Sequence, residues 1–359
     1  MLITQSFSIL TMIPINTALC SFGMSGKVFH APFLEVHTGF RLYGAWERSK
    51  KEVQKYYPHV LSYDRYEDLL SDPAVELVIV NTPNYTHYEF AKAALLAGKN
   101  VLVEKAFTVT VAQTEDLIRI AREKKRKLTV YQNRRWDSDF KTVRNVVQAG
   151  LLGEIVEAEI HFDRYNLSLS PKVHKETPAP GAGILHDLGP HIIDQALQLF
   201  GKPEALFADL RIIRSLSQVW DYMDVLLYYP NARVRVKSSY ITKEPLPAFV
   251  LHGTSGSFLK HRADVQETAL QKGSKPDGPG WGQEPEANQG LLHIVKNSTE
   301  ERYRVPTLAG NYMEFYEALH QALSASAPLP VSPEEGLMVM KVIEAAIASH
   351  EQKRVIDFN

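Results

Sequence analysis

Short apolar runs alternate with helical stretches through the first third of the chain, and this alternation is the feature that most constrains the fold. The apolar runs are 13–20, 40–46, 75–81, 100–104 and 128–131. Helical stretches between them include 88–97, which Gly98 ends, and the amphipathic stretch 111–124. Such alternation is typical of a parallel sheet covered by helices on both faces. We therefore predict an α/β domain over residues 12–135.

Past Phe140 the pattern changes to an alternation of apolar and polar residues. The stretch 156–163 alternates in this way, and 232–237 repeats it. Strands with this pattern bury one face and leave the other to water, substrate or another subunit. We therefore predict that residues 136–359 form an α+β domain with an open, mostly antiparallel sheet backed by helices.

The composition excludes several classes of partner. The 359 residues include 40 basic and 41 acidic side chains, so the chain lacks the global positive field that nucleic acid or an anionic membrane selects. No apolar run approaches the roughly 20 residues that span a bilayer. The single cysteine, Cys20, rules out an internal disulfide and indicates a reducing compartment. We expect a cytoplasmic protein with a small, weakly charged ligand and no nucleic-acid or membrane partner.

The stretch 1–11 lacks the basic region and the cleavage site of a secretory signal. We therefore do not expect such a signal here. Met12 stands directly before the first apolar run and could be the true start.

A turn with two glycines, CSFGMSG at 20–26, follows the first apolar run and precedes a helical stretch. Strand, turn and helix is the context in which a glycine fingerprint binds a dinucleotide in the Rossmann fold, because backbone N–H groups at the helix start must approach the pyrophosphate closely. Ser21 stands where such turns usually place their first glycine. Taken alone, these seven residues fit an ordinary loop equally well. The predicted cofactor contacts in this turn are Phe22, Gly23, Met24, Ser25 and Gly26.

The end of the second apolar run bears on the choice of nucleotide. The stretch 46–50 lies about 20 residues beyond the glycines, where such folds place the group that reads the adenosine ribose. Glu47 could accept hydrogen bonds from a ribose 2'-hydroxyl, which would favour NAD. Arg48 and Lys50 could pair with a 2'-phosphate, which would favour NADP. A solvated charged turn is the alternative to both, and we predict cofactor contacts from Glu47 and Arg48.

Two further strand ends carry polar side chains. Thr82 and Asn84 follow the third apolar run, at the carboxyl edge of the sheet, where ligands bind. Thr86 is better explained as the N-cap of the next helix. Lys105 directly follows the fourth run, so its charge is held beside the ligand crevice.

In the second half, Asp187 and His191 are four residues apart in an expected helix and would share one of its faces. An acid beside an imidazole can hold its tautomer and tune its basicity for proton transfer. A satisfied histidine on a helix shoulder is the alternative. A metal site is a poorer explanation, because this pair offers only two ligands and the sequence has no partner cluster at suitable spacing.

These motifs together resemble the glucose-fructose oxidoreductase/inositol dehydrogenase/rhizopine-catabolism (Gfo/Idh/MocA) family of nicotinamide-dependent oxidoreductases. The motifs that carry the resemblance are 23–26, 104–105, 133–136, 187–191 and 330–336. Within the family, 27–32 and 279–282 are similar to the scyllo-inositol dehydrogenase-like branch. The resemblance implies a Rossmann domain, NAD or NADP as cofactor, a cyclitol or sugar as substrate, and a homodimer or homotetramer.

The resemblance also implies roles for individual residues. His191 would take the hydroxyl proton as hydride leaves for the nicotinamide, Lys105 would hold the substrate oxygen, and Asp187 would position the substrate or the histidine. Tyr165 and His174 are expected to contact the substrate. The remaining expected cofactor contacts are Thr82, Asn84, His87, Glu104 and Asn133.

Two positions depart from the family pattern. Ala106 replaces the proline that usually follows the lysine, which affects the placement of Lys105. Ser21 replaces the first glycine of the turn and could loosen the cofactor.

Three functions fit this pattern. The first is a NAD(P)-dependent dehydrogenase that acts on a CH–OH group of a cyclitol or sugar. The second is a glycosidase that oxidises its substrate transiently, eliminates the aglycone and regenerates its NAD. The third is a non-catalytic nucleotide-binding or redox-sensing protein. The intact lysine, aspartate and histidine favour the first.

Overall fold

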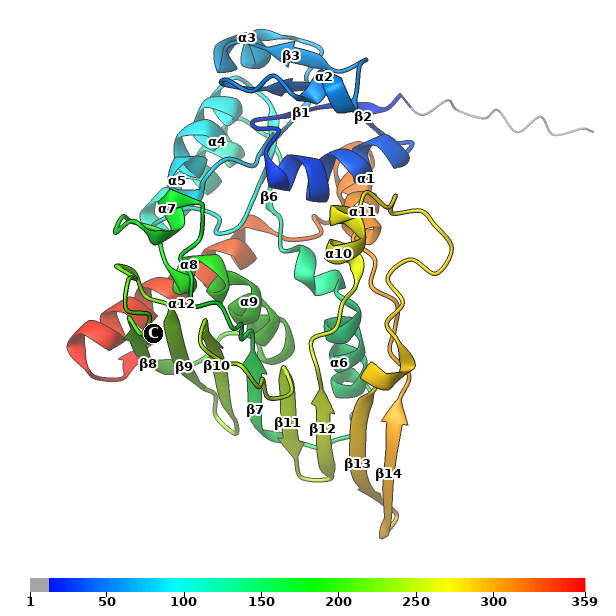
Figure 1. Ribbon diagram of the computed structural model, residues 1–359, viewed down its shortest axis with the longest axis vertical. Coiled ribbons are helices and arrows are strands. Elements are labelled where there is room, and N and C mark those ends of the chain that lie inside the picture. Colours follow the sequence, from blue (N-terminus) through cyan, green and yellow to red (C-terminus); the bar gives the residue numbers. More distant parts are fainter. Residues whose placement is uncertain (1–12, 359) are drawn as a thin grey trace, which may run out of the picture.

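The computed structural model describes residues 13–358 and contains two sheets, the smaller at the top of Figure 1 and the larger at the bottom. The smaller sheet has six parallel strands in the order β3-β2-β1-β4-β5-β6. Its strands are β1 (Ile15–Leu19), β2 (Phe40–Trp46), β3 (Leu61–Tyr63), β4 (Leu77–Val80), β5 (Asn100–Val103) and β6 (Leu128–Val130). The predicted Rossmann-type parallel sheet is confirmed. The sequence pattern missed only β3, whose three residues are too few to show a period.

Helices connect these strands. They are the π-helix η1 (Gly26–His30), α1 (Ala31–Val36), α2 (Val53–Tyr56), α3 (Tyr66–Ser71), the 3-10 helix η2 (Asn84–Thr86), α4 (His87–Leu96), α5 (Val111–Glu123) and the 3-10 helix η3 (Asn133–Trp136). Strands β1 and β4 are neighbours although two strands separate them in the sequence. The winding of the chain therefore reverses between them, and the loops after β1 and β4 diverge to form a crevice at the carboxyl edge.

The larger sheet has nine strands in the order β14-β13-β12-β11-β7-β10-β9-β8-β15. Its strands are β7 (Ile155–His161), β8 (Ala205–Arg211), β9 (Tyr222–Tyr228), β10 (Arg233–Ser239), β11 (Phe249–Gly253), β12 (Gly256–Lys260), β13 (Gly290–Lys296), β14 (Thr299–Val305) and β15 (Ile356–Asp357). Only β7 and β10 pair in parallel, and every other pairing in this sheet is antiparallel. The predicted mostly antiparallel sheet is confirmed.

Helices back one face of this sheet. The helices of this part are α6 (Ser138–Gln148), α7 (Val173–Glu176), α8 (Ile184–Asp187), α9 (Gly189–Phe200), α10 (Gln266–Gln271), the 3-10 helix η4 (Glu286–Asn288), α11 (Met313–Ser324) and α12 (Pro333–Gln352). Helix α12 packs on β8, and α9 packs on β10. Phe207 and Arg235, which lie in one row across β8, β9 and β10, stay exposed. The homodimer or homotetramer expected from such an open face stays a prediction.

A buried ion-pair cluster joins η3, α9 and α12. The Arg135 guanidinium donates two hydrogen bonds to the Asp194 carboxylate (2.6 and 2.8 Å) and one to Glu335 (2.8 Å), and the Arg135 side chain is only 5% exposed. Glu335 also completes the capping box with Ser332 at the start of α12. Because α12 packs on α5 and β6 as well as on β8, the C-terminal helix touches both sheets. The division into domains 12–135 and 136–359 stays a prediction.

Thr86 is the N-cap residue of α4, as predicted, but its side chain does not cap the helix, because the Thr86 hydroxyl bonds the Pro83 backbone oxygen (2.6 Å) and the Thr82 hydroxyl (2.8 Å) instead. Met12, the suggested start, lies outside the described residues. Within residues 13–358, no helix is long and apolar enough to cross a membrane.

Replacing Arg135 by methionine should destabilise the fold strongly. The substitution leaves the Asp194 carboxylate buried without its partner, which costs about 3–5 kcal/mol of the free energy of unfolding. Arg119→Met is the matched control, because the Arg119 side chain is 57% exposed and pairs with Asp116 and Glu123 at the surface. Exposed ion pairs of this kind contribute about 1 kcal/mol or less to the free energy of unfolding. Urea unfolding measures the free energy of unfolding of both variants. Equal losses in the two variants would contradict the stabilising role of the buried Arg135 cluster.

Candidate active site

Lys105 reaches from the carboxyl edge of the parallel sheet into the second domain. It follows β5, and its Nζ donates hydrogen bonds to the Asp187 backbone oxygen (2.5 Å) and to Asp187 Oδ1 (3.3 Å). Asp187 is the last residue of α8. The Lys105–Ala106 peptide bond is cis although the second residue is alanine. Two of the three predicted catalytic residues, 82 positions apart in the sequence, are therefore in direct contact.

The Asp187 carboxylate is the centre of a polar cluster. Lys175 Nζ lies 2.7 Å from both of its oxygens, and the Tyr240 hydroxyl donates a hydrogen bond to Oδ2 (3.2 Å). Burial opposes ionisation of Asp187, but the charges of Lys105 and Lys175 outweigh it and hold the Asp187 pKa well below its usual range. Burial also lowers the pKa of Lys105, and Asp187 offsets part of that effect. Asp187 is thus a permanent anion between two lysines.

His191 lies in the first turn of α9, and its side chain is buried. Its Nδ1 is buried and has no hydrogen-bond partner among residues 13–358. Burial lowers the pKa of His191 well below 6.5, and the charges of Lys105 and Arg134 lower it further. The imidazole is therefore neutral near neutral pH and can accept a proton.

The interpretation that Asp187 holds the His191 imidazole is wrong. The Asp187 carboxylate bonds Lys175, Lys105 and Tyr240, and within the described part of the chain no hydrogen bond joins it to His191. The physical reason is that α8 ends at Asp187 and α9 begins at Gly189, so the two residues do not share a face of one continuous helix.

The turn after β1 is built around Gly26. A Cβ at this position would lie 2.7 Å from the Ser21 backbone oxygen and 3.1 Å from Asn81 Nδ2, so the turn requires glycine there. Asn81 Nδ2 donates a hydrogen bond to the same Ser21 oxygen (2.7 Å), which fixes the turn against β4. The Ser21 hydroxyl accepts a hydrogen bond from the Gly23 N–H (3.2 Å). Ser21 thus stabilises the turn and occupies one backbone donor.

The other residues of this turn differ in how far they are exposed. Phe22 is buried, and its ring contacts Tyr56 at 5.7 Å between centroids, so only its backbone can face a cofactor. Gly23 and Met24 are exposed where the helical stretch begins, and Ser25 is half-buried. Exposed backbone at a helix start, with Gly26 closely packed beside it, fits the pyrophosphate of a dinucleotide.

Glu47, at the end of β2, holds the loop that follows it, and its predicted ribose contact stays a prediction. Its carboxylate is buried and accepts hydrogen bonds from the backbone N–H groups of Glu52 (2.7 Å) and Val53 (3.0 Å). Both oxygens are therefore engaged in holding the following loop. Arg48 and Lys50 are exposed at the same strand end. The sequence suggested a ribose contact because it shows the position of Glu47 but not its partners.

Glu104 connects the glycine turn to Lys105. Its carboxylate accepts hydrogen bonds from the Ser25 hydroxyl and from the Lys105 N–H (3.2 Å), and His30 Nε2 lies 3.1 Å from Oε1. Burial would raise the pKa of Glu104, but the contacts with His30 and Ser25 outweigh it and lower the pKa to about 2. His30 in turn bonds the Tyr316 hydroxyl (2.8 Å). Glu104 is therefore an anion that ties the turn to the strand carrying Lys105.

Comparison with known proteins agrees with this geometry. Residues 15–132 match the model for "Oxidoreductase family, NAD-binding Rossmann fold", and residues 144–358 match the one for "Oxidoreductase family, C-terminal alpha/beta domain". The chain belongs to the Gfo/Idh/MocA family. It is 35% identical to scyllo-inositol 2-dehydrogenase (NADP(+)) IolW of Bacillus subtilis over 342 residues, which cover 95% of each chain.

Two further relatives cover nearly the whole chain. An uncharacterised oxidoreductase of Schizosaccharomyces pombe is 37% identical and covers 96% of this chain and 100% of its own. A solved structure from Bacteroides fragilis is 44% identical, with a TM-score of 0.88 over 96% of this chain and 100% of that one. This Gfo/Idh/MocA protein is thus an oxidoreductase with a nicotinamide-nucleotide-binding fold.

Asn84 and His87, two of the predicted cofactor contacts, also join loops. Asn84 Nδ2 donates a hydrogen bond to the Gly181 backbone oxygen (2.6 Å), which links the first domain to the segment before α8. His87 is buried, with Nδ1 2.8 Å from the Ala106 backbone oxygen and Nε2 2.8 Å from that of Thr82. These contacts hold the loops after β4 and β5 together beside Lys105.

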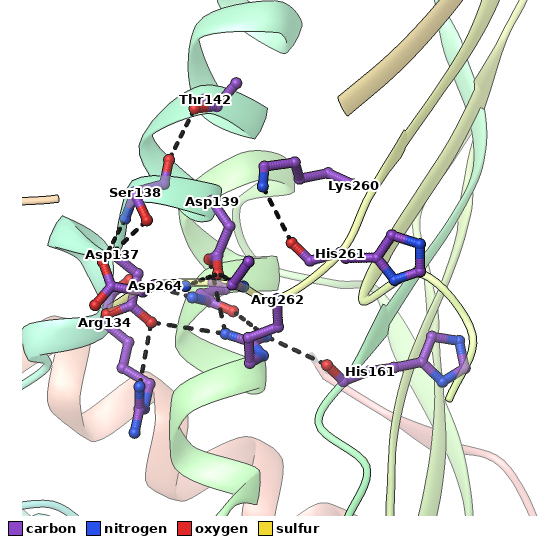
Figure 2. A network of polar contacts seen from close by, with 12 residues as sticks. Arg134, Asp137, Ser138, Asp139, Thr142, His161, Lys260, His261, Arg262 and Asp264 are labelled. Carbon is purple, nitrogen blue, oxygen red and sulfur yellow. Dashed lines mark hydrogen bonds and ion pairs between the residues drawn. The ribbon is translucent and has the colours of Figure 1, made fainter. Parts of the chain in front are cut away.

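Figure 2 shows a buried polar network that includes Arg134 and Arg262, whose charges help to lower the pKa of His191. The Asp137 carboxylate accepts a hydrogen bond from Arg134 (3.2 Å), and the Arg262 guanidinium donates to the His161 backbone oxygen (3.3 Å). The Tyr312 hydroxyl also donates to Asp137 (2.7 Å). Burial raises the pKa of Asp137 well above its usual value. The network fixes η3, which contains Asn133, another predicted cofactor contact and a buried residue.

The predicted substrate contacts are partly outside this cluster. Tyr165 is 51% exposed, and Lys243 Nζ lies 5.5 Å from its ring. The side chain of His174 is not among those the structure describes. Lys175 and Tyr240 were missed by sequence reasoning. Tyr240 follows β10 directly, at the end of a strand of the mostly antiparallel sheet, and Lys175 lies in the four-residue helix α7, which is too short to show a sequence pattern.

Among the residues that the structure describes, no group of three or more His, Cys, Asp or Glu is placed to hold a metal ion. Cys20 is a free, buried thiol.

The two glycines of the turn should respond differently to alanine. Gly26→Ala places a Cβ 2.7 Å from backbone and should lower stability by about 1–3 kcal/mol. Gly23→Ala places its Cβ at an ordinary 3.5 Å from Ser21 Oγ and should leave the stability of the ligand-free protein nearly unchanged while weakening the binding of the nicotinamide nucleotide. Thermal unfolding and cofactor titration of both variants check this. A stable Gly26→Ala protein with normal cofactor affinity would contradict the role of this turn.

Proposed function

We propose that this protein is a dehydrogenase that transfers hydride between NADP(H) and a CH–OH group of a cyclitol or sugar, in the cytoplasm. The observation that carries the proposal is the contact of Lys105 with Asp187 beside a buried histidine whose pKa is held below 6.5. A neutral base and a cationic group at the carboxyl edge of a Rossmann sheet are what alcohol oxidation needs. The Bacillus subtilis relative is named as a scyllo-inositol dehydrogenase that uses NADP(+).

Each group has a distinct role in this proposal. His191 accepts the hydroxyl proton, and its depressed pKa keeps it unprotonated before the reaction. Lys105 donates to the substrate oxygen and stabilises the developing alkoxide. Asp187 is a positioning residue that holds the ammonium groups of Lys105 and Lys175. The bound nicotinamide supplies the hydride chemistry.

The preference for NADP over NAD is supported by the end of β2. An NAD-specific site uses a free carboxylate for the ribose hydroxyls, whereas both oxygens of Glu47 already bond loop amides. Arg48 and Lys50 remain exposed and cationic there, as a 2'-phosphate requires. NAD is the alternative and is tested in parallel.

A substrate panel tests the proposed activity. Cyclitols and aldoses are offered with NAD+ or NADP+, and we expect reduction of the cofactor, faster with NADP+. His191→Asn should lower kcat by about 10²–10⁴-fold because the base is lost, with NADPH affinity unchanged. His293→Asn, at an exposed strand position, is the matched control. No reduction with either cofactor would overturn the proposal, and turnover of glycosides by retained NAD without net reduction would indicate the glycosidase instead.

The pH dependence of substrate oxidation should report the protonation of the His191 imidazole. Its folded pKa lies below the unfolded value of 6.5, so the base stays unprotonated as the pH falls from neutrality to 6.5. We expect kcat/KM to stay level over that interval and to fall only at lower pH. The measurement is a kcat/KM profile with saturating cofactor, accompanied by unfolding curves to exclude loss of structure. An acid limb centred above pH 6.5 would assign the base to another group.

A further inference from the structure

The surroundings of Asp187 contain more positive charge than hydride transfer uses. Lys105 and Lys175 share the Asp187 carboxylate. Arg164 and Lys172 come from the flanking loops and are exposed, and within residues 13–358 no carboxylate lies at ion-pair distance from either of them. A chain whose total charge nearly cancels thus concentrates cations in one place.

Arg164 is held beside the proposed base. The Arg164 backbone N–H donates a hydrogen bond to the Ser239 backbone oxygen at the end of β10 (2.8 Å). Its guanidinium lies 5.2 Å from the centroid of the Phe162 ring, and that ring lies 6.3 Å from the His191 ring. After burial, the charge of Arg164 is among those that lower the pKa of His191. The guanidinium is therefore within electrostatic range of the reacting centre.

The loop that carries Lys172 is fixed in place. Glu176, at the end of α7, pairs with the Arg214 guanidinium (2.8 Å), which also pairs with Asp221 (2.9 Å), and the Arg214 side chain is only 2% exposed. One turn of backbone connects Lys172 to Lys175, whose Nζ touches Asp187. The buried ion pairs of Arg214 therefore hold the segment that carries both lysines beside Asp187.

We propose that the substrate of this site carries an anionic group, a carboxylate or a phosphate ester, that Arg164 and Lys172 bind while its CH–OH group meets His191. The guanidinium fork matches either anion, and exposed cations without carboxylate partners are free to pair with it. This inference rests on the proposed function and narrows its substrate to acidic polyols or sugars. It revises the sequence expectation of a weakly charged ligand, because net charge does not report local clustering.

The anionic groups of the cofactor are the competing explanation for these cations. The glycine turn and the end of β2, which fit the pyrophosphate and the 2'-phosphate, both belong to the first domain. Arg164 and Lys172 instead belong to loops of the second domain, around Asp187 and His191. Separate measurements of cofactor binding and of substrate-analogue binding distinguish a cofactor role for these cations from a substrate role.

Three probes on one ring test the proposal: glucose, glucuronate and glucose 6-phosphate. Calorimetric titration of the full chain saturated with NADPH measures binding without turnover. We expect at least one anionic probe to bind about tenfold or more tightly than glucose, because a charge-assisted contact is added. The advantage should shrink as salt is raised. Preference for glucuronate would indicate a carboxylate substrate, and preference for glucose 6-phosphate a phosphate ester.

Variants that remove one positive charge each test whether Arg164 and Lys172 bind the anionic group. Arg164→Gln and Lys172→Gln should each weaken the favoured anionic probe by about tenfold and leave glucose and NADPH binding nearly unchanged. Lys296→Gln, the same charge change at an exposed end of β13, should have no effect.

Loss of NADPH affinity in these variants, equal loss for glucose, or no preference for either anion would overturn the inference. Turnover of neutral polyols without any anion preference would contradict only this inference. Anion binding without turnover of any substrate would contradict only the proposed function.

Discussion

The contact between Lys105 and Asp187 is the constraint on which the rest of the site depends. It joins the end of β5 to the end of α8 and so brings the catalytic candidates of both domains together. Gly183 makes it possible: its φ of 82° turns the chain into α8, and a Cβ there would lie 2.7 Å from the Trp220 backbone oxygen. A different turn would separate Asp187 from Lys105 and Lys175 and leave three charges without partners beside the cofactor crevice.

Charge in this protein is balanced overall and segregated locally. Arg135 is paired tightly with Asp194 and Glu335, so its charge is neutralised locally and stabilises packing. Around Asp187, by contrast, cations predominate, and this excess together with burial keeps His191 neutral. The same local excess stabilises a developing alkoxide and attracts an anionic substrate. One electrostatic arrangement therefore serves both proton transfer and recognition.

Much of the fold and part of the site could be predicted from sequence. The apolar periods indicated both sheets, and the strand-end rule placed Lys105 correctly at the carboxyl edge of the parallel sheet. The partners of the charged groups could not be predicted. Glu47 has the spacing of a ribose ligand, yet it bonds the amides of Glu52 and Val53, and Asp187 pairs with Lys175 rather than with His191.

The sequence by itself determined the order and type of the elements and the chemical groups available at their ends, because periodicity and turn residues act over a few neighbouring positions. Only the tertiary structure decided which of these groups meet. Lys105 and Asp187 are 82 residues apart, and His30 meets Tyr316 across 286. Such contacts, and the shifts in pKa that follow from them, depend on how the two sheets dock and on how much water the docking excludes, which no local pattern encodes.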